Sequence, residues 1–121
     1  MKLTQALLRE HKIFNPHNLC RVAKNKLFID YIPADNGRFA QSSKWQVVGI
    51  GFATDTLGAW YNNGCKTFLV GSRKNKQPEL EKAIAWCKEN YGIGEFERDV
   101  FGCYQIKGTL DKIATMIKEA K

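Results

Sequence analysis

The stretch from Lys66 to Gly92 most constrains how this chain can fold, because it reads as a strand, a polar turn and a helix in direct succession. Residues 66–71 form a short apolar and β-branched run that ends at a glycine, which predicts a buried strand. Pro78 suits the first position of a helix, and Gly92 suits its end. Between them, apolar residues recur on one helical face: Leu80, Ile84, Cys87 and Tyr91.

The turn between this strand and this helix is basic. It contains Ser72, Arg73, Lys74 and Lys76. A helix N-terminus presents free backbone N–H groups and the positive end of the helix dipole, and nearby cations add to its attraction for an anion, especially a phosphate. These four residues are therefore candidate ligands of a phosphate. The turn lacks the glycine pattern of a Walker loop or a dinucleotide-binding fold, however, and a solvated turn is the simpler interpretation.

The net charge of +7 is unevenly distributed along the chain. Residues 1–76 contain twelve Lys or Arg against four Asp or Glu, a net of +8, whereas residues 77–121 contain seven against eight, a net of −1. A positive surface attracts polyanions and anionic metabolites, and surface charge that merely aids solubility is the alternative.

Length and composition predict one domain, residues 1–121, because 44% hydrophobic residues suffice for a single core. No apolar run could span a bilayer and no signal peptide is recognisable, so we expect a cytoplasmic protein without a membrane partner. The cysteines stand far apart, at positions 20, 65, 87 and 103. Their spacing predicts buried, reduced thiols, and we expect neither a metal nor a cofactor.

The first half of the chain predicts a short helix near residues 3–10 that is capped by Thr4. Residues 16–23 suit either a further helical turn or an ordered loop. Strands are expected at 26–32 and 45–52, which are rich in β-branched and aromatic residues. Residues 55–64 suit either a helical turn, which we favour slightly, or a hairpin into the next strand.

The second half adds one more strand region and a helix. Residues 95–101 and 103–107 read as one bent strand or as a strand interrupted near Gly102. Thr109 is the expected cap of a final amphipathic helix. Strands grouped before helices predict an α+β domain, with a mainly antiparallel sheet of about four strands and helices packed largely on one face.

A run of charged residues, Glu97-Arg98-Asp99, lies inside the otherwise apolar strand region. Alternation places Arg98 on the face of Phe96 and Val100, where a charge is costly unless it is paired or holds a ligand. Arginine suits two-pronged contacts with phosphate, and the adjacent carboxylate suits a ribose hydroxyl. The alternative is an ion pair on an edge strand.

Catalytic patterns are not recognisable in the sequence. His11 and His17 lack neighbours that would orient them as bases, and no carboxylates have an acid/base spacing, so we predict no enzyme. Aromatic rings could stack on bases, although most rings in a domain of this size belong to the core. The candidates are Trp45, Phe52, Trp60, Tyr61 and Phe68.

The strand with Phe68, the loop Ser72-Arg73 and the late pair Arg98-Asp99 give the chain a resemblance to the small phage anti-Thoeris sponge proteins. The resemblance implies a phage-encoded protein of the host cell cytosol that sequesters cyclic ADP-ribose signals made by TIR-domain enzymes, or cyclic oligonucleotides, in dimers or larger assemblies. It also implies that Arg98 binds phosphate, Asp99 a ribose hydroxyl and Phe68 a base.

Three functional hypotheses follow. The first is a non-catalytic, homo-oligomeric protein that sequesters a small phosphate-bearing nucleotide. The second is a small basic protein that binds nucleic acid or inhibits a nuclease complex, as the +8 of residues 1–76 suggests. The third is a subunit-interaction protein without a ligand.

Overall fold

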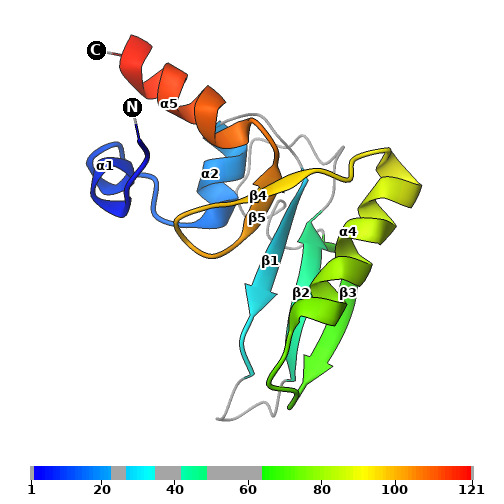
Figure 1. Cartoon of the computed structure of the whole chain (residues 1–121). Helices are drawn as coiled ribbons and strands as arrows, with labels where there is room; N and C mark the ends of the chain where they lie inside the picture. The colour runs from blue at the N-terminus through cyan, green and yellow to red at the C-terminus, as the bar shows by residue number, and fades with distance from the viewer. Residues whose placement is uncertain (1, 23–26, 35–41, 49–63, 121) are drawn as a thin grey trace.

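The computed structural model describes residues 2–22, 27–34, 42–48 and 64–120 (Figure 1). In chain order its elements are α1 (Gln5–Glu10), α2 (Pro16–Val22), β1 (Phe28–Ile32), β2 (Ser43–Val48), β3 (Gly64–Gly71), α4 (Gln77–Tyr91), β4 (Phe96–Arg98), β5 (Tyr104–Ile106) and α5 (Thr109–Glu119). The strands form one antiparallel sheet in the order β3-β2-β1-β5-β4. The α+β class is confirmed, and the described part of the sheet has five strands where about four were expected.

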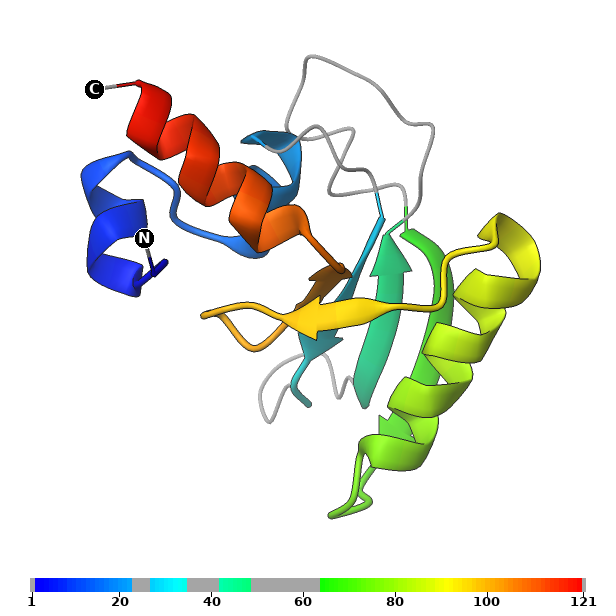
Figure 2. The same ribbon diagram turned by 45° about the horizontal axis from the view of Figure 1, so that its top comes forward.

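The predicted strand, turn and helix of residues 66–92 are confirmed. Helix α4 has its proline in the first turn and ends at Gly92, whose φ of 72° is the left-handed conformation that glycine adopts readily. Figures 1 and 2 show α4 lying along β2 and β3. Its buried face contributes Leu80, Ala83 and Cys87 to the main core. That core also contains Leu27, Ile29, Trp45, Val47 and Val70.

The remaining helices gather together away from α4 (Figure 2). Leu8, Leu19 and Ile113 from α1, α2 and α5 are fully buried in a second apolar cluster. Cys20 of α2 packs with Phe28 and Val48 of the sheet, which by alternation point away from α4. The helical alternative is correct for residues 16–22, while residue 23 lies outside the described ranges. Thr4 caps α1 as predicted, accepting a 3.1 Å hydrogen bond from the N–H of Leu7.

Residues 95–107 form a hairpin, which corrects the expectation of one bent strand. The predicted interruption near Gly102 is in the right place, but the chain reverses there, and Arg98 of β4 pairs with Tyr104 of β5. The reversal follows from Asp99, whose carboxylate accepts hydrogen bonds from the N–H groups of Phe101 (2.8 Å) and Cys103 (3.0 Å). Gly102 itself has a φ of 88°, which a side chain would disfavour.

The cap of α5 also differs from the prediction. Thr109 is the first helical residue, and Gly108 occupies the cap position with a φ of 94° and no side chain to accept a bond. Glu97 caps the helix in its place, because its Oε1 accepts from the N–H groups of Gly108 (3.1 Å) and Leu110 (2.9 Å). The predictions for residues 49–52 and 55–63 lie outside the described residues.

Candidate functional site

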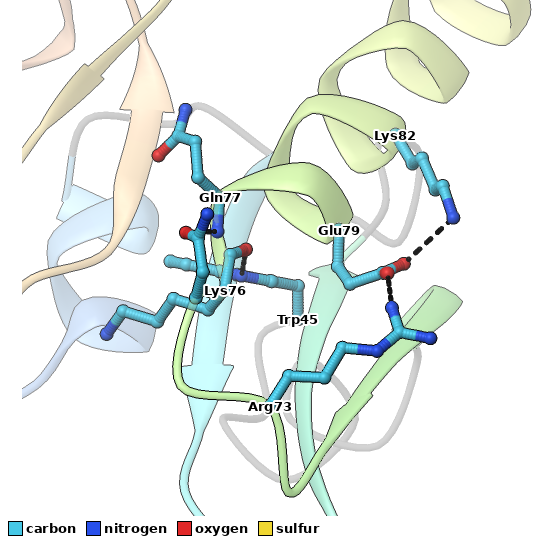
Figure 3. A network of polar contacts seen from close by, with 7 residues as sticks. Trp45, Arg73, Lys76, Gln77, Glu79 and Lys82 are labelled. Carbon is cyan, nitrogen blue, oxygen red and sulfur yellow. Dashed lines mark hydrogen bonds and ion pairs between the residues drawn. The ribbon is translucent and has the colours of Figure 1, made fainter.

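The cationic side chains Arg73 and Lys76 of the basic loop before α4 point in two different directions (Figure 3). Arg73 forms an ion pair with Oε1 of Glu79, and the Lys82 ammonium lies 3.3 Å from the other oxygen of that carboxylate. The Glu79 side chain is only 6% exposed and stands in the first turn of α4, where a negative charge is favourable. Arg73 therefore neutralises a buried carboxylate at the start of the helix, which leaves it less available to an external anion.

Lys76 points the other way, and two contacts fix it. Its carbonyl oxygen accepts a 3.0 Å hydrogen bond from the indole N–H of Trp45. Its ammonium lies 3.9 Å from the ring centroid of Tyr31 and 5.6 Å from that of Trp45, so two aromatic faces attract the cation. Ser72 and Lys74, the other two candidates in this loop, are exposed to solvent.

The Asp99 carboxylate already accepts hydrogen bonds from within the protein. In addition to its two bonds within the hairpin turn, its second oxygen accepts a 2.9 Å bond from the amide of Gln105. Burial raises the pKa of Asp99 above its ordinary value, the three hydrogen bonds oppose that rise, and the negative charge of Asp30 adds to it. A ribose hydroxyl would have to compete with these donors, so the geometry assigns Asp99 a role in shaping the turn.

Phe68 does not lie with Arg98. It is on β3, where it pairs with Trp45 and packs partly buried against the main core. Because β3 and β4 are the two edges of the sheet, three strands separate Phe68 from Arg98. The grouping of Phe68 with Arg98 and Asp99 that the resemblance implies is therefore not formed within one described sheet.

The structure instead brings Arg98 and Lys76 to one surface with two tyrosines. Tyr104 is paired with Arg98 on one side and with Ile29 on the other, and paired residues of antiparallel strands share a face. Tyr31 is two residues beyond Ile29 and packs on the same side, next to the main core. We call this set, together with Gly102, the tyrosine surface: Tyr31, Lys76, Arg98, Gly102 and Tyr104.

Gly102 lies in the hairpin turn beside Arg98. A Cβ atom on Gly102 would lie 3.7 Å from an Nη2 atom of Arg98, so the guanidinium passes beside this glycine. Lys76 lies over Tyr31 of β1, whereas Arg98 is on β4, on the far side of Tyr104 of β5. The two cations therefore lie towards opposite ends of the tyrosine surface.

The tyrosine surface borders the main core. Buried Trp45 lies beside the two tyrosines on the same face of the sheet, with its ring centroid 5.0 Å from that of Tyr31 and 5.7 Å from that of Tyr104. Helix α4 packs on β2 and β3 (Figure 1), so the tyrosines on β1 and β5 stay partly accessible. Both cations are exposed, and within the described ranges neither forms an ion pair with a carboxylate. The arrangement can hold a planar ring beside negative charge.

Sequence reasoning identified Arg98 and Lys76 but missed Tyr31 and Tyr104. In the sequence both tyrosines look like ordinary strand residues, since their proximity depends on β5 pairing with β1 across more than 70 positions of the chain. The only local signal is the alternation of Ile29 and Tyr31, which indicates that they share a face without showing what lies beside it.

Arg98 also borders a pocket of about 610 Å³ beside α5. Its lining residues are Lys2, Leu3, Glu97, Arg98, Asp99, Val100, Leu110 and Asp111. Two of its three carboxylates already have internal partners, and exposed Asp111 opposes any anion that enters. The pocket is therefore less suited to phosphate than the tyrosine surface.

The described residues give little support for a metal site or for a nucleophilic cysteine. Among them, no three His, Cys, Asp or Glu side chains gather where they could hold a metal ion. The side chains of Cys20, Cys87 and Cys103 are buried, and burial raises the pKa of Cys20 to about 12, which disfavours the nucleophilic thiolate. No helix in this part of the chain is long and apolar enough to cross a membrane.

Comparisons of the chain with models of protein families, with curated proteins and with solved structures found no match.

Proposed function

We propose that this protein is a non-catalytic binder of a phosphate-bearing nucleotide and that the tyrosine surface is its site. The proposal rests chiefly on one observation: two partly exposed tyrosine rings share a face with two exposed cations, Lys76 and Arg98, which have no carboxylate partner among the residues that the structure describes. Aromatic faces bind bases by stacking, and Arg and Lys bind phosphate, so the surface combines both parts of nucleotide recognition.

Each predicted site residue takes a distinct place in this proposal. Arg98 and Lys76 contact phosphate, and exposed Lys74 and Ser72 extend the same loop towards solvent. Asp99 shapes the turn that presents Arg98, and Arg73 neutralises Glu79. Phe68 belongs to the core.

Sequestration is the biological role that we attach to this binding. The resemblance to phage sponge proteins supports it, together with the expectation of a homodimer or larger homo-oligomer in the host cytosol. Non-catalytic sequestration requires only that the ligand be held and returned unchanged, for which stacking rings and fixed cations suffice.

The first test is equilibrium binding of mono-, di- and cyclic nucleotides to Arg98→Ala and Tyr31→Leu. We expect each change to weaken binding roughly tenfold, since a charged hydrogen bond or a stacked base contributes about 1–3 kcal/mol. Leucine at position 31 keeps the apolar contact with the core, and thermal unfolding will show whether both variants remain folded.

Lys118→Ala and Tyr91→Leu are matched controls, because Lys118 is an exposed lysine of α5 and Tyr91 packs on Trp86 at the other end of α4. Both should bind like the unchanged protein. If Arg98→Ala and Tyr31→Leu bind every nucleotide as tightly as these controls, the tyrosine surface is not the site.

A further inference from the structure

We infer that the nucleotide bound at the tyrosine surface is part of a single-stranded nucleic acid. This inference rests on the proposed function, because it specifies the ligand of the same site.

The first argument is the position of the two cations. In a strand, each base has a phosphate on both sides of it along the backbone, whereas a mononucleotide carries its phosphates on one side only. The Lys76 ammonium lies over Tyr31 of β1, and Arg98 is on edge strand β4, on the far side of Tyr104. A surface with cations on both sides of its rings matches a chain that enters at one side and leaves at the other.

The second argument is that positive charge continues beyond Lys76 along the loop before α4. Exposed Lys74 lies two residues before Lys76 in the same loop. Three exposed cations, Lys74, Lys76 and Arg98, can contact more phosphates than one nucleoside monophosphate carries.

The third argument is the shape of the surface. Tyr31 and Tyr104 lie on neighbouring strands and are partly exposed, beside buried Trp45 on the same face of the sheet. Gly102 adds no side chain beside the Arg98 guanidinium. Rings on an open, cationic face are how many proteins bind single strands with little sequence preference.

The test measures binding of fluorescent single-stranded RNA and DNA of about 4 to 16 nucleotides, the range occupied by one small binding domain, against mononucleotides, cyclic nucleotides and duplexes. We expect affinity to rise with length until the three cations are engaged and then to level off. Single strands should bind at least about tenfold more tightly than any mononucleotide or cyclic nucleotide.

Salt dependence gives a second readout that a folding defect would not reproduce. Neutralising about three phosphates of a single strand predicts a slope of about −2.1 in a plot of log K against log salt, or about a twentyfold loss of affinity between about 50 and 200 mM. Lys76→Ala and Arg98→Ala should each make the slope shallower by about 0.7, while Lys118→Ala leaves it unchanged. Tyr31→Leu and Tyr104→Leu should weaken binding about 5- to 150-fold without altering the slope.

The outcomes separate this inference from the proposed function. If one small cyclic or mononucleotide binds as tightly as any oligonucleotide and loses affinity in Arg98→Ala, the nucleotide site stands and the single-strand ligand is wrong. If duplexes bind as well as single strands and Tyr31→Leu has no effect on affinity, bases do not stack on the tyrosine surface and the single-strand ligand is wrong. Both proposals fail if neither nucleotides nor oligonucleotides bind.

Discussion

At the scale of single residues, the run Glu97-Arg98-Asp99 shows what sequence reasoning can and cannot resolve. Alternation correctly places Arg98 on the face opposite Glu97, and its exposure removes the cost expected for a buried charge. The three residues nevertheless do three separate things: Glu97 caps α5, Arg98 borders the tyrosine surface and Asp99 closes a turn. Their partners lie 2 to 13 positions away, and side-chain type alone does not identify them.

We predict that the Asp99 carboxyl stabilises the fold mainly through the hydrogen bonds that it accepts and less through its negative charge. Asp99→Ala leaves the buried donors of Cys103 and Gln105 without an acceptor, so the free energy of unfolding should fall by about 3 kcal/mol. Asp99→Asn keeps one oxygen for the turn, and the Gln105 amide can rotate to offer its Oε1 atom, which has no partner among the described residues. The Asp99→Asn change should therefore cost less than about 1 kcal/mol at neutral pH.

The pH dependence of unfolding checks this prediction. Burial raises the pKa of Asp99, so the folded protein binds that proton more tightly than the unfolded chain does. The contribution of Asp99 to stability consequently grows as the pH falls through its folded-state pKa, and Asp99→Asn lacks this gain. Chemical denaturation should show that the free energy of unfolding of Asp99→Asn falls further below that of the unchanged protein as the solution becomes acidic. Parallel profiles for the two proteins would show that Asp99 is not the buried acid described.

At the scale of elements, local patterns predicted α1, α4 and β3 correctly, because each carries its own start and end signals, such as Thr4 before α1 and Gly92 after α4. The hairpin of β4 and β5 was not predicted, since three-residue strands give almost no periodicity. The cap of α5 was misplaced for a related reason. Its acceptor comes from β4, eleven residues before Gly108, and helix-start rules consider only neighbouring positions.

The cap supplied by Glu97 gives a prediction for the C-terminal helix. Glu97→Ala removes the acceptor of two N–H groups at the start of α5 and should lower the free energy of unfolding by about 1–2 kcal/mol. Glu97→Gln keeps an oxygen and loses only the charge, so about 0.5 kcal/mol is expected. Glu95→Ala is the control, because Glu95 is exposed on the same segment. Equal stability of the Glu97 and Glu95 variants in chemical denaturation would exclude capping by Glu97.

At the scale of the whole molecule, the partial coverage of the sheet connects fold to function. Helix α4 covers β2 and β3 (Figure 1), and on the same face Tyr31 of β1 and Tyr104 of β5 are partly exposed. The α+β class follows from element order, which can be read from the sequence, whereas the order of strands in the sheet depends on distant pairings. For that reason the separate candidates Lys76 and Arg98 were found, and the surface that unites them was not.

Trp45 lies next to both Tyr31 and Tyr104 and also hydrogen-bonds to the backbone of Lys76. Replacing it tests whether the core positions the tyrosine surface. Trp45→Phe keeps a buried ring between Tyr31 and Tyr104 but removes the N–H that bonds to the carbonyl of Lys76. Losing this buried hydrogen bond and part of the ring should lower the free energy of unfolding by about 1–2 kcal/mol.

The same change frees the backbone of Lys76, so the Lys76 ammonium should spend less time over Tyr31, and nucleotide affinity should fall although no ligand contact has been removed. Trp86→Phe on α4 is the control, since Trp86 contacts Tyr91 outside the tyrosine surface. A Trp45→Phe protein that is less stable but binds as tightly as Trp86→Phe would show that the core holds the sheet together without organising the surface above it.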